Sequence, residues 1–161
     1  MNRFLAMPGI EHLQNIHPLI VHFPVALIPS SAAVYFAAWI GGRPSWQWGG
    51  LLLLVMGVTG AAAAVATGLY AVPGVMLAPS VKETLLADHK RIMLATLALG
   101  GLLAVWALAA RPMPMRGRLL FMLAMLLLVG LLAKGADYGV RMVYDYNAGG
   151  FACGQPIEFT H

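Results

Sequence analysis

Four long apolar runs dominate the chain, and short polar or glycine-rich segments separate them. The runs cover residues 18–40, 46–72, 81–110 and 117–146. Each run reaches the length of about 20 residues that a helix needs to cross the hydrocarbon core of a membrane. Because a backbone in lipid must satisfy its own hydrogen bonds, these runs are expected to be helices. The pattern predicts an all-α membrane protein in which four transmembrane helices form an antiparallel bundle.

The segments around these runs complete the predicted organisation. Residues 1–16 form a mixed polar N-terminal segment, residues 17–146 the four-helix transmembrane domain, and residues 147–161 a C-terminal tail. The first third of the third run is polar, and Ser80 with Glu83 fits a capping box there. The third helix is therefore expected to begin before it enters the membrane.

Composition agrees with the membrane class. Of the 161 residues, 60% are hydrophobic and 10% charged, and the mean hydropathy is +0.79. A soluble domain of this size could not bury so much apolar surface. The formal net charge is +4, but the ten Lys and Arg residues form no basic stripe, which argues against nucleic acid as a partner. The single cysteine, Cys153, excludes an internal disulfide, a CxxC zinc site and the CxxCH attachment of a c-type haem.

Charged residues divide unevenly between the two ends of the predicted bundle. All six acidic residues lie on the side that holds both termini and the longer connection at residues 73–80. The short connections on the other side carry basic residues alone, namely Arg43, Arg111, Arg116 and Arg118. Short basic loops tend to remain in the cytoplasm. We therefore expect a multi-pass protein of the inner (plasma) membrane with both termini on the outer, periplasmic side.

This topology gathers most polar residues of the spans in one layer near the outer interface. They are His17, His22, His89, Asp137, Arg141, Tyr144 and Tyr146. Ionisable groups inside a membrane are energetically costly, so they indicate function by default. The inner half of the predicted bundle contains almost no side chain that could bind a ligand or take part in a reaction.

Two histidines and two prolines open the first run, in the stretch IHPLIVHFPV. Pro18 suits the first turn of a helix, and Pro24 is expected to bend the helix further in. His17 and His22 are five residues apart, so they should point about 140° apart on one helix. A single metal ion therefore cannot bind both His17 and His22. His22 is the preferred ligand, while His17 supports it from outside the helix or belongs to a second centre. An interfacial histidine bonded to a neighbour is the alternative for His22.

The third run carries a histidine at a depth similar to that of His22. Because the first and third helices start on the same side, His22 and His89 are expected to oppose each other across the bundle. Asp88 is a candidate for fixing a histidine tautomer. Lys90 and Arg91 are candidates for holding an anionic group, although such side chains also extend to lipid headgroups without further role. A solvated interface position is the alternative for His89.

The fourth run carries a stripe of polar residues. Lys134, Asp137, Arg141 and Tyr144 follow spacings of 3, 4 and 3, which places them within about 60° on a helix. In a membrane such a stripe is expected to face the bundle and pair internally. One interpretation is a structural ladder of ion pairs. In the other, Arg141 or Lys134 holds a buried anion, such as a haem propionate or a quinone headgroup.

Small residues and methionines complete the list of candidates. Gly60, Ala64 and Gly68 form a small-xxx-small ridge that predicts close helix packing in the second run. Most of the ten methionines are expected to fill apolar space, and only Met76 and Met142 lie in the right layer to be ligands.

Three stretches give the chain a resemblance to a bacterial four-helix membrane family, domain of unknown function 2231. They are HPLIVHFPVAL in the first run, DHK at the head of the third, and GVRMVYDYNAGG at the end of the fourth. Members of this family resemble haem-binding membrane modules, and some are joined to or neighbour c-type cytochrome domains. The resemblance implies electron transfer, with His17, His22 and His89 as polar positions of the site. Tyr146 and Asn147 stand where the family pattern has His and Gly, which removes a potential ligand of a second centre.

The first of three functions is that of a b-type haem subunit of a respiratory complex. Imidazoles from two facing helices can clamp haem iron without any covalent motif, and His22 with His89 is the expected pair. Arg141 with Lys90 or Arg91 would hold the propionates of one or two haems. The subunit would relay electrons between the quinone pool and a periplasmic c-type cytochrome, beside other membrane subunits, and would not itself be catalytic.

Two other functions stay open. One is a copper or zinc site, in which the three histidines combine with Asp88 or Glu11. The other is a purely structural subunit of a larger membrane complex. The polar tail, which contains Cys153 and His161, is expected to be flexible and to take no part in metal binding.

Overall fold

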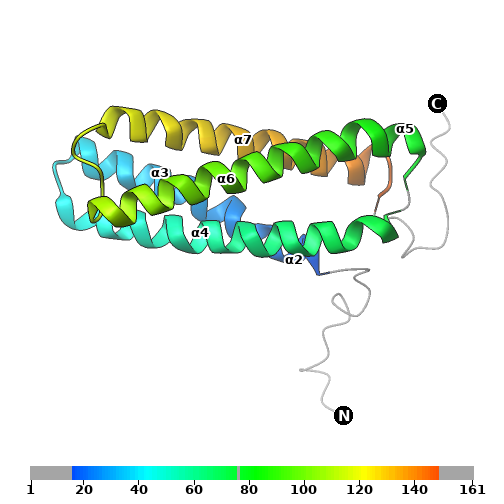
Figure 1. Cartoon of the computed structure of the whole chain (residues 1–161), viewed down its shortest axis with the longest axis horizontal. Coiled ribbons are helices and arrows are strands. Elements are labelled where there is room, and N and C mark those ends of the chain that lie inside the picture. Colours follow the sequence, from blue (N-terminus) through cyan, green and yellow to red (C-terminus); the bar gives the residue numbers. More distant parts are fainter. Residues whose placement is uncertain (1–15, 76, 149–161) are drawn as a thin grey trace, which may run out of the picture.

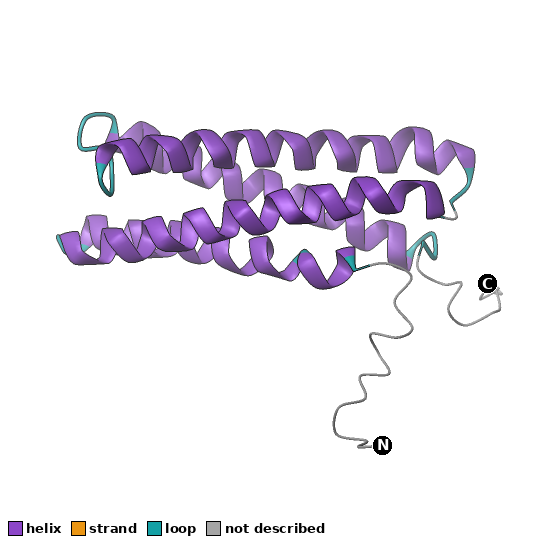
Figure 2. Ribbon diagram, turned by 60° about the horizontal axis from the view of Figure 1, so that its bottom comes forward, coloured by secondary structure: helices purple, strands orange, loops and turns teal. Residues whose placement is uncertain are grey.

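All regular structure in the described part of the chain is helical (Figure 2). The computed structural model describes residues 16–75 and 77–148. Four spans are long and apolar enough to cross a membrane: His17–Ile40, Pro44–Gly74, Pro79–Ala110 and Arg118–Tyr144. The predicted all-α architecture of four transmembrane helices is therefore confirmed. The predictions for residues 1–15 and 149–161, including Glu11, Cys153 and His161, lie outside the described residues.

Each span is built from one or more helical elements. The first contains α2 (His17–Ile20) and α3 (His22–Ile40), and the second contains α4 (Pro44–Ala71) and the 3₁₀ turn η1 (Val72–Gly74). The third contains α5 (Pro79–Val81), the wider π-helical turn η2 (Lys82–Leu86) and α6 (Ala87–Ala110). The fourth is α7 (Arg118–Tyr144).

The four long helices form a square in which each packs against two neighbours. The packed pairs are α3 with α4, α4 with α6, α6 with α7, and α7 with α3. The first and third spans are therefore diagonal to each other. The described chain begins and ends at the same end of the bundle, together with the α4–α5 connection (Figure 1). We refer to it as the outer end; its place on the periplasmic side of the membrane stays a prediction.

The core at the opposite, inner end is tightly packed and aromatic. Tyr35 is fully buried and meets Phe121 edge to face, with ring centroids 5.2 Å apart. Phe121 meets Trp106 in the same way at 5.7 Å. The Tyr35 hydroxyl donates a hydrogen bond of 2.9 Å to the carbonyl of Pro112 in the α6–α7 connection. This bond ties α3 to the connection between the third and fourth spans.

Glycines of α4 let the first span approach closely, as the small-residue ridge predicts. A Cβ atom at Gly60 would lie 3.0 Å from the Cβ of Phe23, and one at Gly68 would lie 2.9 Å from the ring of His17. Ala64, between them, is buried. The ridge therefore seats the outer end of the first span, including one of the histidines.

Two local predictions have different outcomes. The first span is interrupted at Val21, between α2 and α3, because Pro24 has no N–H for the carbonyl one turn before it. The capping box in the third span is wrong. Its first helix starts at Pro79 after Ala78, and no side chain caps it. Ser80 lies inside the helix, where its carbonyl accepts the hydroxyl of Thr84 at 2.8 Å.

Candidate functional site

His17 opens the first span and lies against the second. Its ring covers Gly68, and its Nδ1 is 3.3 Å from the hydroxyl oxygen of Thr67. Thr67 donates its own hydroxyl proton to the carbonyl of Ala63 or Ala64. The Thr67 oxygen can therefore only accept from the imidazole, and the Ala64 carbonyl is a second acceptor beside it. These partners place the imidazole proton on Nδ1 and the lone pair on Nε2.

His89 lies near the start of α6 and bonds to the fourth span. Its Nδ1 donates to the carbonyl of Gly135 over 2.8 Å. A Cβ atom at Gly139, one turn further along α7, would lie 3.5 Å from the ring. Gly139 thus leaves room for the imidazole against α7, whereas a Cβ atom at Gly135 would meet Met93 and Ile92. The bond to a carbonyl fixes the Nδ1–H tautomer, so His89 also carries its lone pair on Nε2.

His17 and His89 belong to one site. Both are partly buried at the outer end of the bundle, and they are near enough to interact electrostatically. They come from the first and third spans, which are diagonal in the bundle. Each ring is held through Nδ1 by a neighbouring span, His17 by α4 and His89 by α7. We call these two residues the histidine pair.

His22 does not take the place that the sequence predicted for it. Its side chain is exposed, and its Nδ1 lies 3.3 Å from the carbonyl of Leu19 in the preceding turn. The predicted angle of about 140° between His17 and His22 explains why only one of them can face inward. The residue that faces α4 is His17, because α2 packs on the glycine ridge. The structure therefore places His17, and not His22, among the partly buried residues at the end of the bundle that holds His89.

The cations near the pair lie mostly on the outside of the bundle. Arg91 is 80% exposed and pairs with Asp88 at 3.3 Å. Asp88 therefore fixes the arginine, and the Gly135 carbonyl takes the predicted role of fixing the His89 tautomer. Lys90 is partly buried on the same helix.

The polar stripe of α7 also faces outward, contrary to the prediction that it faces the bundle. Lys134 pairs with Asp137 at 3.4 Å, and Arg141 pairs with Asp145 at 3.5 Å. All four side chains are about half exposed, and Tyr144 is largely exposed. The ion pairs form along one helix, so they connect no two spans.

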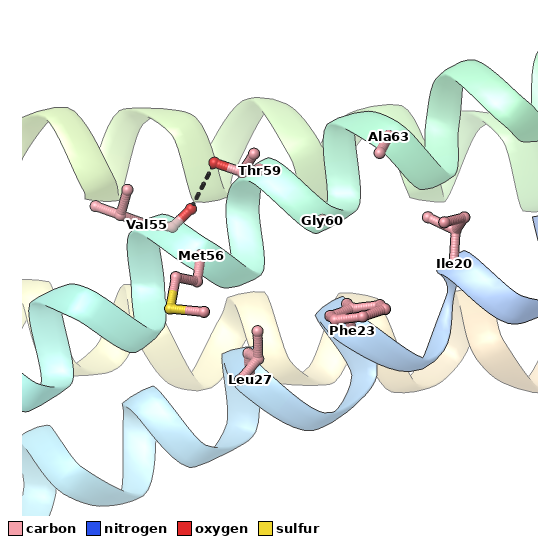
Figure 3. Close-up of a pocket in the computed structure, with 8 residues that line it drawn as sticks. All are labelled: Ile20, Phe23, Leu27, Val55, Met56, Thr59, Gly60 and Ala63. Carbon is pink, nitrogen blue, oxygen red and sulfur yellow. Dashed lines mark hydrogen bonds between the residues drawn. The ribbon is translucent and has the colours of Figure 1, made fainter.

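One surface groove lies between the first two spans, and it is apolar (Figure 3). Its volume is about 350 Å³. Its lining residues are Ile20, Phe23, Leu27, Val55, Met56, Thr59, Gly60 and Ala63. The hydroxyl of Thr59 donates to the carbonyl of Val55 in its own helix, and the lining contains no charged residue and no histidine. The groove is therefore separate from the histidine pair.

The described residues contain no group of three or more His, Cys, Asp or Glu side chains that could hold a metal ion. A zinc site needs three or four protein ligands, so this part of the chain does not supply the predicted copper or zinc centre. Met142 is buried against Leu85 and Leu86, and Met76 lies outside the described residues.

Sequence reasoning missed the groups that hold the two rings. They are Thr67 and Gly68 on α4 and Gly135 and Gly139 on α7. A signal for the second pair was present, because two glycines four residues apart in a leucine-rich helix mark a face that another group approaches closely. Thr67 gave no comparable signal.

The comparisons with known proteins agree with this architecture. Neither a curated protein nor a solved structure matches the chain. A family model described as "Predicted membrane protein (DUF2231)" matches residues 13–150, a range that includes the four spans and both members of the histidine pair. The chain belongs to this family of membrane proteins.

Proposed function

We propose that the protein is a b-type haem electron-transfer subunit of the inner membrane, in which His17 and His89 would hold the haem iron. One observation carries the proposal: two partly buried imidazoles, His17 from the first span and His89 from the third, lie at the same end of the bundle, and each is held through Nδ1 by a neighbouring span. When bound, a haem of this type supplies one-electron chemistry at its iron. The chain's own residues would hold the group and isolate it from the inner side of the bundle.

The number of ligands favours haem over a simple metal ion. The porphyrin itself fills four positions around the iron, so two protein ligands complete the coordination. A zinc or copper ion would need at least one further side chain, and the described residues offer no cluster of three. The histidine pair therefore fits a bis-histidine haem better than either alternative ion.

The hydrogen bonds of both rings also suit ligation. Ligating histidines almost always donate their second ring N–H to a carbonyl, carboxylate or water, which fixes the ring and its tautomer. The Gly135 carbonyl takes this role for His89, and Thr67 with the Ala64 carbonyl takes it for His17. Both lone pairs are thus on Nε2, the nitrogen most remote from the backbone.

The proposal extends to the groups that would hold the propionates and to the electron partners. Lys90, which is partly buried on α6, is proposed to hold a propionate. Arg91, Lys134 and Arg141 each pair with a carboxylate on an exposed surface, so a propionate would have to displace that carboxylate. Tyr144, which is exposed near the outer end of α7, is proposed to lie beside the bound haem. A membrane quinol would donate electrons and a periplasmic c-type cytochrome would accept them, within a complex that contains other membrane subunits.

A reduced-minus-oxidised absorption spectrum of the purified full-length chain tests the proposal. The wild-type chain, made in haem-replete cells, should show the α-band of a low-spin b-type haem. His17→Ala and His89→Ala should each remove this low-spin signature, because each leaves the iron with one axial imidazole. His22→Ala is the matched control and should leave the spectrum unchanged.

Two results would overturn the proposal. One is a folded wild-type chain without haem. The other is a low-spin spectrum that survives loss of His17 or His89 while His22→Ala removes it, which would restore His22 as the ligand.

A purely structural role is the second candidate, and the same hydrogen bonds favour it. His17 ties α2 to α4, and His89 ties α6 to α7. If this were their whole function, His89→Gln would keep a donor for the Gly135 carbonyl and lose little stability or activity of the complex. In the haem proposal His89→Gln removes the low-spin spectrum even where the chain remains folded.

A further inference from the structure

We propose that the inner end of the bundle binds anionic phospholipids, whose phosphate groups would lie against arginines of the two short connections. Both connections lie at this one end (Figure 1). Arg43 belongs to the α3–α4 connection, Arg111 and Arg116 to the α6–α7 connection, and Arg118 is the first residue of α7. We call these four residues the inner arginines. The inference is independent of the haem proposal, because the histidine pair lies at the outer end.

The positive charge of the inner arginines is not neutralised by the described part of the chain. The acidic residues of that part lie toward the outer end, at Glu83, Asp88, Asp137 and Asp145. The ion pairs among the described residues all form there, with Arg91, Lys134 and Arg141 as the cations. The arginine side chains that donate hydrogen bonds within the described residues are likewise Arg91 and Arg141. Anions from outside the chain are therefore expected to meet the inner arginines.

Tryptophan rings hold two of these guanidinium groups in place. The Cζ atom of Arg43 lies 5.6 Å from the ring centroid of Trp46, and that of Arg118 lies 5.3 Å from the ring centroid of Trp39. The second contact also joins the start of α7 to the end of α3. A ring face attracts the charge of the cation, but a guanidinium has five N–H donors in a planar fork. Such a contact leaves most of these donors available for phosphate oxygens.

The tryptophans also place the inner arginines at the depth of the lipid headgroups. All four tryptophans of the chain lie within about one helical turn of the inner end of their helix; they are Trp39, Trp46, Trp48 and Trp106. Tryptophan is enriched at the membrane interface, where its ring sits at the level of the headgroups. Because Arg43 and Arg118 contact two of these rings, their guanidinium groups share that level. The anions found at this depth in a membrane are lipid phosphates.

The surroundings of the inner arginines favour an anionic lipid over a zwitterionic one. A zwitterionic headgroup carries its own cation, which other cations repel, whereas an anionic headgroup brings uncompensated negative charge. Basic side chains beside a membrane are attracted to anionic lipids in this way, and basic sites between helices bind such headgroups. Ile40 is 72% exposed and Trp48 is 55% exposed at the same end, so the acyl chains of a lipid have apolar surface to pack against.

Tryptophan fluorescence tests the proposal at the inner end itself, because all four tryptophans of the chain lie there. The full-length chain is reconstituted in vesicles of phosphatidylglycerol and phosphatidylcholine, with bromine on the acyl chains of one lipid at a time. At equal mole fractions, brominated phosphatidylglycerol should quench the fluorescence more strongly than brominated phosphatidylcholine. Equal quenching by the two lipids would overturn the proposal and would point to an acidic protein segment as the partner of this end.

Removal of charge identifies the side chains that select the lipid. The double variant Arg43→Gln with Arg118→Gln should lower the preference for phosphatidylglycerol about fivefold. Lys82→Gln with Arg91→Gln is the matched control, because it removes the same charge at the outer end and should keep the preference. If the first double variant fails to fold, Arg43→Gln alone, in an exposed connection, should still lower the preference roughly twofold. An unchanged preference without the inner arginines, or an equal loss in the control, would refute the site.

Discussion

At the scale of single residues, the absence of a side chain at Gly68 lets the His17 ring lie against α4. Any side chain there would begin 2.9 Å from the imidazole and 3.1 Å from its Nδ1. Gly68→Ala should therefore displace the ring from Thr67 and cost about 1–3 kcal/mol of stability. Unfolding in mixed detergent micelles measures the loss, and a haem spectrum reports the displaced ligand.

Gly101→Ala is the control for this change. It adds the same methyl group to a helix where nothing lies within 4 Å, so stability should stay constant or rise by less than about 1 kcal/mol. Equal losses from the two substitutions would show that the His17 ring does not depend on Gly68.

The two histidines of the first span show the limit of sequence reasoning at this scale. The helical period predicted that His17 and His22 point in different directions. It could not decide which direction is inward, because that depends on the glycine face of α4 and on the interruption at Val21. Both determinants come from packing between spans, so the sequence could not show that His17, and not His22, lies against α4.

At the scale of elements, Tyr35 connects α3 to the loop between α6 and α7. Tyr35→Phe would leave the Pro112 carbonyl without the hydrogen bond of 2.9 Å. The expected loss is about 1 kcal/mol in the free energy of unfolding, measured by denaturation in mixed micelles. Tyr70→Phe, at a side chain that is 88% exposed on α4, should change nothing. A loss of the same size in both variants would mean that the hydroxyl bond is not the cause.

The element α7 is where pattern reasoning about membranes failed most clearly. The four spans, their helical nature and their antiparallel order follow from apolar run length, because lipid leaves the backbone no other choice. The stripe at Lys134 and Arg141 was expected inside, on the assumption that one copy must satisfy its own charges. The side chains lie outside, where each cation pairs with a carboxylate of its own span or of the residue that follows it.

At the scale of the whole molecule, the histidine pair and the aromatic core occupy opposite ends of the bundle. The histidine pair lies at the outer end, next to the glycines of α4 and α7. The inner end is closed by the cluster around Tyr35, Phe121 and Leu54. Among the described residues the buried polar side chains are Ser31 and Thr96, and each hydroxyl donates to a backbone carbonyl. The sequence predicted that His17, His22 and His89 share one layer, and the structure places all three in the outer parts of their helices.

The closed inner end bears on how the protein would respond to the voltage across the membrane. Moving one elementary charge through the full field changes its energy by about 2.3 kcal/mol for each 100 mV. An electron that enters and leaves at the layer of His17 and His89 would cross little of that field. Electron exchange in liposomes should therefore keep the same rate when a potassium diffusion potential is imposed. A rate that follows the voltage would require a charge path through the cluster around Tyr35. In the haem interpretation, the chain exchanges electrons within one leaflet and contributes no membrane potential of its own.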